Sequence, residues 1–572
     1  MFQFLIYLYI SMLFFKNFAT NFALENKWTI VIYILIIVLF FPFESVVLPK
    51  IYGSLFDQLK DGIKGDFSNV FENLQKMNLQ GSIFAVLIAW LVIVLSYGAK
   101  HHLEAILIPD FYAHIRKVLY DKTINAFKDN YSDVRAGEYL SRMLELMRNA
   151  KDLFQYLLNG LFPYFIATIF TIIYLIMNTN DIGYVLLISV VLVAILLYFM
   201  GNYILELVKE RENYMNEQVN QGQIQNSIDN LMNIYINNEA DNEIKKNNKL
   251  ESVASAKMNK IMFYQNVAIT SGDTIILAAY GTSIYLIYKL LKEKKIKSSE
   301  AIVYILILGQ FLSYGMDLIG GYIHNIIYKL GIIYAAEPFL NEIFIDESKR
   351  VKLTGISKGN IEFKDIVFRY KKDSDELLYD GLNLKIKGGT SMGLMGRSGS
   401  GKTTLMKMLV GLYKPEDGIV TIDGIDINTL NVDYLREHVN YVNQNTKLFE
   451  NSVIYNMKYG NDISEEEIVS KLKKYKLENV FDDLPDGIGA DAGLNGGNLS
   501  GGMQKITILM RGILKKGDII ILDEPLAGLD KNTISKVIEM ILQETTNKTL
   551  IVITHDNAIL PHLDRVVDIN SL

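Results

Sequence analysis

Six long apolar segments dominate the N-terminal part of the chain. A helix of about 20 residues crosses a hydrocarbon core about 30 Å thick, so each segment is long enough to span a bilayer. Only residues 178–181 separate the third segment from the fourth, which predicts a tight helical hairpin. The segments are residues 28–47, 82–99, 157–177, 182–205, 262–288 and 301–319. They predict an all-α membrane domain of six spans, which we assign to residues 27–344.

Two long polar stretches, residues 100–154 and 206–260, separate some of these segments. Their apolar residues recur at roughly helical spacing, so we expect helices that leave the membrane and fold back through a short cross-helix. Basic residues crowd the first stretch, as is typical of the cytosolic side. The lysines of residues 289–297 fall on the outer side, against this tendency. We interpret that loop as a solvated turn; the alternative is contact with anionic lipid headgroups or an acidic substrate.

The chain opens with a shorter apolar run at residues 2–15, which Lys16 ends. As a helix it would extend about 21 Å, less than the hydrocarbon core. It predicts an interfacial elbow helix within residues 1–26. An extra span or an uncleaved signal anchor is the alternative.

Composition narrows the class of protein. Half of the 572 residues are hydrophobic, which is too apolar for a wholly water-soluble protein. The net charge of −6 leaves no basic excess for phosphate, so we expect no nucleic acid partner. The chain contains no cysteine, which excludes disulfides, thiolate metal sites and a cysteine nucleophile.

Two acidic residues, Asp273 and Asp317, lie inside predicted spans at similar distances from the outer loop. An ionisable group in a span is costly and usually faces a cavity or a partner. Our hypothesis is that both line an inward-open cavity and favour cationic or polar substrates. The alternative is a hydrogen bond to a neighbouring helix, or a place at the inner headgroup level. Gly315, Gly320 and Gly321 would allow close helix approach or hinging.

After a polar linker at residues 345–359, residues 360–572 change to short strand-like runs. Residues 391–395 form one such run, and residues 404–409 read as a helix. Between them lies GRSGSGKT, whose glycines let backbone N–H groups face phosphates at a helix N-terminus. The residues predicted to bind ATP in this loop are Gly396, Ser398, Gly399, Ser400, Gly401, Lys402, Thr403 and Thr404.

Further polar residues follow other strand-like runs. Asp523 ends an apolar strand and is expected to hold Mg²⁺ with Thr403 and Gln444, and Gln444 is also expected to reach the attacking water. Glu524 comes next and is the candidate base that polarises the attacking water. His555, after the strand at residues 549–553, is placed to contact the γ-phosphate and to hold the water–Glu524 geometry. Tyr370, which ends the strand at residues 361–368, is expected to stack on adenine.

This set, together with LSGGM at residues 499–503, resembles an ABC transporter nucleotide-binding domain. The whole chain resembles an exporter-type half-transporter. The resemblance implies a dimer in which each ATP lies between one phosphate loop and the partner's signature, here Ser500, Gly501, Gly502 and Met503. It also implies that Asp530 contacts the opposite subunit. The fold class is then a multi-domain membrane protein, with a six-helix membrane domain before an α/β P-loop NTPase cassette.

The chain departs from the family pattern at two positions. Met503 replaces the usual Gln of the signature, and Leu494 stands where a Glu usually couples to the membrane loops. One interpretation is a heterodimer with one weakened ATP site. The other, which we favour, is a homodimer that tolerates Met, because Glu524 and His555 are intact.

The sequence therefore predicts an integral, multi-pass membrane protein with a cytosolic ATPase domain. The function that we expect is ATP-driven export of an amphipathic or lipid-like substrate by alternating access. Membrane lipid, a second half-transporter and an unidentified substrate are the expected partners, with ATP and Mg²⁺ as cofactors. A nucleotide-gated channel or a regulatory half of a heterodimer is the alternative.

Overall fold

The protein consists of two compact units. Residues 1–123 and 134–344 form the first unit, and residues 124–133 and 345–572 form the second. The computed structural model describes residues 18–63, 79–128, 136–344, 356, 358–370, 376–444 and 446–571. The apolar run at residues 2–15, and with it the predicted elbow helix, lies outside the described residues, as does most of the predicted linker.

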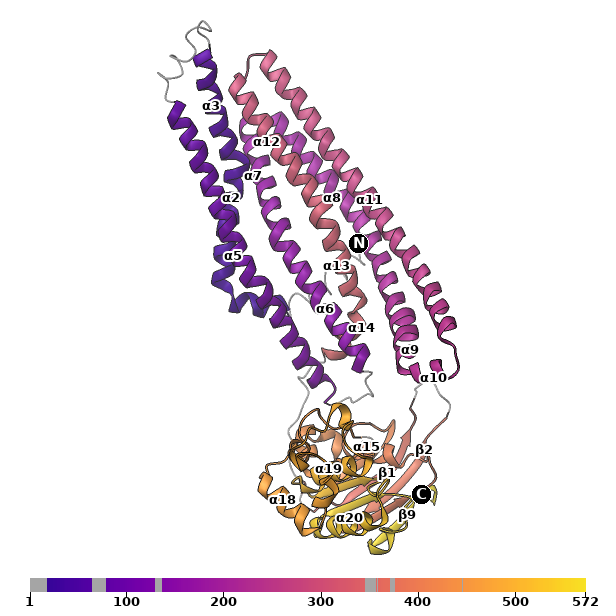
Figure 1. The fold of residues 1–572 in the computed structure, drawn as a ribbon. Helices are drawn as coiled ribbons and strands as arrows, with labels where there is room; N and C mark the ends of the chain where they lie inside the picture. Colours follow the sequence, from indigo (N-terminus) through magenta and orange to yellow (C-terminus); the bar gives the residue numbers. More distant parts are fainter. Residues whose placement is uncertain are drawn as a thin grey trace. The chain divides into compact units, whose positions relative to one another are not determined.

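The first unit is a bundle of long helices (Figure 1). Several are interrupted by wide π-helical turns, η1 (Phe43–Val47), η3 (Leu157–Leu161), η4 (Met215–Gln225) and η5 (Asp317–Ile323). The α-helices are α2 (Lys27–Pro42), α3 (Leu48–Ile63), α5 (Leu79–Ala126), α6 (Ala136–Tyr156), α7 (Phe162–Asn178), α8 (Asn180–Tyr214), α9 (Asn226–Asp229), α10 (Leu231–Ile236), α11 (Ala240–Lys292), α12 (Ser298–Met316), α13 (His324–Ala335) and α14 (Glu337–Ile343).

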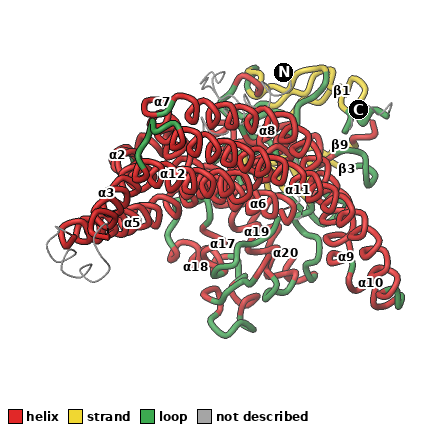
Figure 2. Tube along the Cα trace, turned by 90° about the horizontal axis from the view of Figure 1, so that it is seen from above, coloured by secondary structure: helices red, strands yellow, loops and turns green. Residues whose placement is uncertain are grey.

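Six helical stretches among the described residues are long and apolar enough to cross a membrane, which confirms the six predicted spans. The tight hairpin is also confirmed, since only Thr179 separates α7 from α8. Helices α8, α11 and α12 run alongside one another (Figure 2). Buried apolar side chains of α7, α8, α11 and α12 form the main core between them.

The two polar stretches extend the spans as helices, as predicted. Helix α5 continues unbroken to Ala126, and α11 begins at Ala240. In the second stretch the chain returns through the short helices α9 and α10, which confirms the predicted cross-helix there. In the first stretch, residues 129–135 between α5 and α6 lie outside the described residues, and the cross-helix expected in that stretch stays a prediction.

Small residues allow α11 to approach the end of α12. A Cβ at Gly315 would lie 2.6 Å from the Ile276 side chain, which confirms the close approach predicted there. At Gly320 a Cβ would make only an ordinary contact, and at Gly321 it would meet nothing within 4 Å, so neither serves close approach here, and hinging, the alternative role, stays a prediction. Gly272 serves close approach instead, since a Cβ there would lie 2.9 Å from Ile319.

A buried ionic cluster joins three elements of the membrane unit. The Glu104 carboxylate accepts from the Lys100 ammonium at 2.6 Å and from the Tyr33 hydroxyl at 2.9 Å. Lys100 is 2% exposed and Glu104 is 5% exposed. The same Tyr33 hydroxyl lies 2.6 Å from the Leu158 carbonyl, so the cluster ties α2 and α5 to η3. A pair this deeply buried is sensitive to the loss of either partner.

The second unit contains two sheets. An antiparallel sheet has the order β2-β1-β4-β5, and a parallel sheet has the order β6-β7-β8-β3-β9. The strands are β1 (Ile361–Phe368), β2 (Tyr379–Ile386), β3 (Ser391–Met395), β4 (Asp417–Ile422), β5 (Ile425–Asp426), β6 (Val439–Val442), β7 (Ile519–Asp523), β8 (Thr549–Ile553) and β9 (Arg565–Asp568). Every residue of β7 and β8 is buried, as expected for central strands of a parallel sheet.

Helices surround the parallel sheet. They are α15 (Lys402–Leu409), α16 (Val432–His438), α17 (Val453–Lys458), α18 (Glu465–Lys474), α19 (Gly501–Leu514) and α20 (Lys531–Glu544). The described residues between Gln444 and Leu499 form only α17, α18 and short 3-10 turns, apart from one isolated bridge. This confirms the predicted α/β core with a smaller helical part.

Removing the Glu104 carboxylate should destabilise the membrane unit. In Glu104→Ala the Lys100 ammonium stays buried without its partner, at a cost of about 3–5 kcal/mol. We expect a clear loss of apparent Tm for the detergent-purified protein. The double variant Lys100→Met/Glu104→Leu should recover much of it. Glu293→Ala, which breaks an exposed ion pair, is the control and should change little. An unchanged Tm in Glu104→Ala would contradict this account.

Candidate functional site

A glycine-rich loop joins β3 to α15 at the carboxyl edge of the parallel sheet. Gly401, just before the helix, has a φ of 92°, and a Cβ there would lie 2.3 Å from the Tyr379 hydroxyl oxygen. The position therefore requires glycine. The Lys402 ammonium donates to the carbonyls of Gly396 at 2.8 Å and Arg397 at 2.9 Å. The loop thus curls around a cation at a helix N-terminus, an arrangement that suits phosphate.

Asp523 lies at the end of β7 and is 2% exposed. Its Oδ2 accepts from the Thr403 hydroxyl at 2.8 Å and from the Tyr441 hydroxyl at 3.2 Å. Burial raises the pKa of this carboxyl, against the opposing effect of those hydrogen bonds and of nearby lysines. A hydroxyl and a carboxylate side by side offer two oxygen ligands, which suit Mg²⁺ when phosphate oxygens complete its coordination shell. Among the described residues, no group of three His, Cys, Asp or Glu could hold a metal without such help.

Glu524 has a φ of 50°, in the left-handed region that a residue with a side chain rarely adopts. Its N–H donates to the Ile553 carbonyl at 2.8 Å, which ties the strained turn to the end of β8. The Thr554 hydroxyl donates to one carboxylate oxygen at 3.4 Å, and His555 Nε2 lies 3.9 Å from the other. Strain of this kind clusters at functional sites, and here it fixes the direction of the carboxylate.

These groups share one open cavity of about 260 Å³, slightly smaller than most small-molecule sites. Gln444, Glu524, His555 and Tyr370 line it together with residues of the loop. Tyr370 is 65% exposed, and its hydroxyl hydrogen-bonds the Thr404 hydroxyl. The lining comprises Tyr370, Ser398, Gly399, Gly401, Lys402, Thr403, Thr404, Gln444, Asp523, Glu524, Ile553 and His555.

The predicted signature residues are not among the residues that line this cavity. Ser500 caps the N-terminus of α19, where its hydroxyl accepts the N–H of Met503 at 3.3 Å. Gly501 is exposed and Gly502 is half-buried. The Met503 side chain is only 6% exposed and packs in the apolar core of the helical part. The surface at this helix end is therefore formed by Ser500 and the glycines.

Two other predicted positions lie at the surface. The Asp530 carboxylate caps α20 and accepts the N–H groups of Asn532 and Thr533, each at 3.0 Å. Its hydrogen bonds with Thr533 hold the pKa of Asp530 below its usual range. Leu494 is 71% exposed. An exposed leucine beside the helical part offers an apolar contact where a carboxylate would offer an ionic one.

Sequence reasoning missed three side chains around the carboxylates. Tyr441 and Thr554 bind Asp523 and Glu524 directly, and Lys505 on α19 is close enough for both acidic groups to act on its ammonium. Burial lowers the pKa of Lys505. Tyr441 lies on β6, the neighbour of β7, so strand order rather than sequence spacing brings it to Asp523. Only the parallel pairing of the strands could have revealed this contact.

The two acidic residues of the spans lie in different surroundings. Asp273 is half-buried on α11, and one of its carboxylate oxygens is buried without a hydrogen-bond partner among the described residues. Asp317 is exposed at the start of η5 and acts electrostatically on the hydroxyls of Tyr164 and Tyr322. The Gly272–Ile319 and Gly315–Ile276 contacts put both at a similar level of the bundle.

Comparisons with known proteins match both units. The family model described as ABC transporter matches residues 379–527. A Rickettsia bellii protein named as an export ATP-binding/permease protein is 26% identical over 474 residues, which cover 80% of this chain and 79% of that protein. An ATP-dependent lipid A-core flippase of Francisella tularensis is 34% identical over 212 residues, or 36% of this chain and 34% of the flippase. This chain thus spans only about a third of the flippase.

The fold of the whole chain matches a solved structure. A bacterial Atm1-family ABC exporter with ATP bound has a TM-score of 0.81, with coverage of 95% of this chain and 93% of that chain. The sequence identity is 20%, so the likeness concerns the fold.

Replacing the buried Asp523 should stabilise the nucleotide-free protein and weaken its binding of ATP with Mg²⁺. Because burial raises its pKa, the charged form is disfavoured in the folded state, and Asp523→Asn should raise the apparent Tm of the nucleotide-free protein by a few degrees. The same change should reduce the extra stabilisation by ATP with Mg²⁺. Thermal unfolding with and without the nucleotide measures both effects. Asp518→Asn, at the exposed end before the same strand, is the control; a lower Tm in Asp523→Asn would refute the argument.

Proposed function

Because the chain belongs to the ABC transporters, as a half-transporter of the exporter type, we propose that two copies form a homodimer that exports an amphipathic or lipid-like substrate. The protein is an integral, multi-pass membrane protein whose cassette is cytosolic, and its activity is that of an ATPase coupled to transport. ABC exporters of this kind function as dimers. The observation that carries the proposal is the cavity that gathers Lys402, Asp523, Glu524 and His555 in a chain with six spans.

In the proposed ATP site the phosphate loop binds the nucleotide and the ends of β7 and β8 supply the chemistry. Lys402 neutralises the β- and γ-phosphates, and Thr403, Asp523 and Gln444 hold Mg²⁺. The metal supplies charge stabilisation at the phosphates. Glu524 accepts a proton from the attacking water, and its strained backbone keeps the carboxylate in place. His555, 3.9 Å from that carboxylate, orients the water and contacts the γ-phosphate.

Each site of the dimer would be completed by the partner's signature. Ser500, Gly501 and Gly502 form an anion site at the N-terminus of α19, which has 14 residues. Met503 does not weaken that surface, because its side chain lies in the core of its own cassette. This burial supports the homodimer over a heterodimer with one weakened site. Asp530 and Tyr370 are proposed to contact the opposite subunit and adenine, respectively.

The mechanism that we propose is alternating access. ATP binding brings two cassettes together, and hydrolysis releases them, so the membrane helices exchange between two arrangements. The long helices α5, α6, α8 and α11 would carry this motion. The amphipathic or lipid-like substrate is proposed from the apolar bundle and from the relatives named lipid A-core flippases. A nucleotide-gated channel is the competing function, and ion conductance independent of any substrate would favour it.

The chain expressed alone in nanodiscs should hydrolyse ATP. Glu524→Gln should lower the turnover at least about 100-fold while ATP still binds, because only the base is lost. Met503→Gln should change turnover by less than about twofold, since the buried side chain is remote from the partner's nucleotide. Phosphate release measures turnover. Negligible turnover from a folded, ATP-binding dimer would contradict the homodimer and point to a missing partner half.

Removing both acidic groups of the spans should change transport without changing basal ATP hydrolysis. In Asp273→Asn/Asp317→Asn the size of the side chains is kept and two negative charges are lost, so uptake of a cationic dye into inside-out vesicles should fall several-fold. Vesicles carrying Glu524→Gln give the background. Unchanged dye uptake would show that these carboxylates do not face the substrate path.

A further inference from the structure

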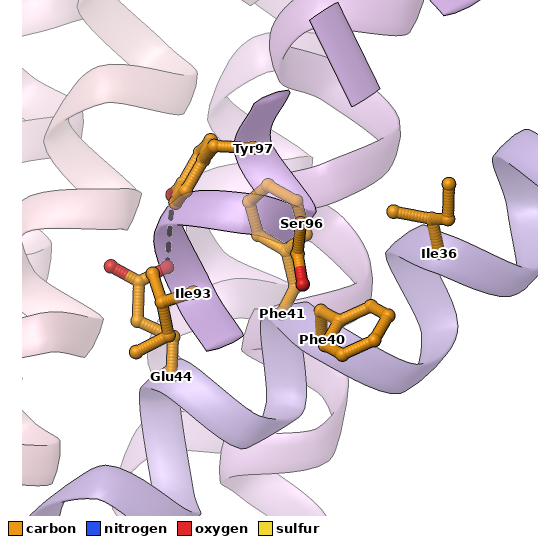
Figure 3. Close-up of a pocket in the computed structure, with 7 residues that line it drawn as sticks. All are labelled: Ile36, Phe40, Phe41, Glu44, Ile93, Ser96 and Tyr97. Carbon is orange, nitrogen blue, oxygen red and sulfur yellow. Dashed lines mark hydrogen bonds between the residues drawn. The ribbon is translucent and has the colours of Figure 1, made fainter. Parts of the chain in front are cut away.

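A third carboxylate lies inside the spans, in a small cavity of the membrane unit that sequence reasoning missed. Glu44 belongs to η1, the wide turn that follows Pro42 within the first span. Figure 3 shows its side chain beside Tyr97, with aromatic and aliphatic side chains on the remaining walls. We call this space the Glu44 cavity; it is lined by Ile36, Phe40, Phe41, Glu44, Ile93, Ser96 and Tyr97.

Glu44 is bound only by neutral groups. The Tyr97 hydroxyl donates to Glu44 Oε2 at 2.9 Å, and the Tyr314 hydroxyl also hydrogen-bonds this carboxylate. Gln310 Nε2 donates to the Tyr314 hydroxyl at 2.8 Å, which leaves the tyrosine proton for Glu44. Among the described residues, no Lys, Arg or His nitrogen lies within 4.0 Å of Glu44. A carboxylate in a span without a cationic partner is costly, and such groups usually serve a ligand or an ion.

Aromatic rings extend from the cavity into the bundle. Tyr97 lies 5.5 Å from the Phe41 ring, and Tyr164 lies 6.3 Å from it. Tyr164 also stacks on Tyr314 at 4.9 Å and meets the edge of Tyr322 at 5.6 Å. The faces of such rings attract cations, and the attraction is stronger away from water. Glu44 therefore stands at one end of an aromatic cluster that suits a positive charge.

The backbone around this cluster is irregular in three of the six spans. Besides η1, which carries Glu44, η3 and η5 interrupt the third and sixth spans. The segment η3 packs against η5, and η1 packs against α7 and α12. A Cβ at Gly160 of η3 would lie 2.2 Å from the Tyr322 ring, so the wide turn admits that ring. π-helical turns are rare and occur frequently at functional sites, so their convergence here is a second, independent indication.

We propose that the Glu44 cavity binds the ammonium head of a cationic amphipath. The proposal names a substrate class for the exporter and so rests on the proposed function. The cavity has a volume of about 10 Å³, room for about one water-sized group, which suits the –NH₃⁺ of a primary amine and not a bulkier head group. Glu44 accepts hydrogen bonds from the N–H groups of the ammonium, and the faces of the aromatic rings stabilise the positive charge of the ammonium. Ile36, Phe40 and Ile93 offer apolar contact to the first carbons of the tail.

Binding of labelled dodecylammonium to nucleotide-free protein in phosphatidylcholine nanodiscs tests this site. Glu44→Gln should raise the dissociation constant about tenfold or more, because the neutral amide keeps the shape and loses the charge. Tyr97→Phe keeps the ring but frees the carboxylate, and should give a smaller increase. Dodecanol, with the same tail and no charge, should bind wild type and Glu44→Gln equally. Asp181→Asn, an exposed acid at the start of α8, is the matched control and should bind like wild type.

The outcomes are distinct. An unchanged affinity for dodecylammonium in Glu44→Gln, or an equal loss for dodecanol, would overturn the proposal. Dodecyltrimethylammonium should bind more weakly than dodecylammonium, since its methyl groups remove the N–H donors; equal binding would overturn the hydrogen-bonded head group. Adding phosphatidylethanolamine to the nanodiscs should compete if the head group comes from a lipid, and leave the affinity unchanged if it comes from a free amine. Either result supports the binding of an ammonium group, and the two results distinguish a lipid head group from a free amine.

Two checks separate folding and turnover from binding. Glu44→Gln should remain monodisperse, with an apparent Tm close to that of the wild type. The affinity for dodecylammonium is measured without nucleotide. A protein that does not hydrolyse ATP or export a substrate would therefore still show whether the Glu44 cavity binds the ammonium. Conversely, an active ATPase with no selective binding would leave the exporter intact and reject its proposed substrate class.

Discussion

The hydrogen bonding between the parallel strands β3, β7 and β8 positions the phosphate loop, Asp523 and Glu524, the groups proposed to act on ATP. Leu394 and Asp523 are both paired with Ile553, so the three strands end in one row. The next residues are the phosphate loop, Glu524 and Thr554, and they meet at the same edge because parallel strands share a direction. A shift of one residue in either pairing would carry Glu524 away from the loop. The ATP site therefore depends on strand register more than on any single side-chain contact.

The cassette was predictable from the sequence because its strands are short, apolar and followed directly by polar residues. The runs that contain Asp523 and precede His555 coincide with β7 and β8. The contacts of Tyr441 and Lys505 with the same site were not predictable, since they depend on which strands and helices become neighbours. Met503 shows the limit most clearly. Its place in the motif indicated a surface residue, whereas the pitch of α19 turns its side chain into the core.

The membrane unit was predictable in its number of spans, because the length and hydropathy of a segment are local properties. Its polar interior was not. Asp273 and Asp317 stood out against apolar neighbours, but Glu44 lies close to the end of an apolar segment, two residues after Pro42, and was passed over. Its importance comes from Tyr97 and Tyr314, which belong to other helices. The distribution of charge inside a bundle depends on helix rotation, and the π-helical turns alter that rotation in ways that a regular period does not describe.

Those turns also affect how the bundle can change during evolution. A π-helical turn holds one more residue than the α-helical turn it replaces, so it behaves as an insertion that the helix has absorbed. Deleting a single residue within η1 could restore a regular helix and would leave the helix faces before and after it nearly unchanged, because the extra residue is absorbed locally; only the side chains of the turn itself, Glu44 among them, would be re-aimed. Single-residue insertions and deletions would then be a route to re-aim side chains such as Glu44 without rebuilding the bundle. Substrate selectivity could therefore diverge among related chains through single-residue insertions and deletions, which a count of substitutions does not include.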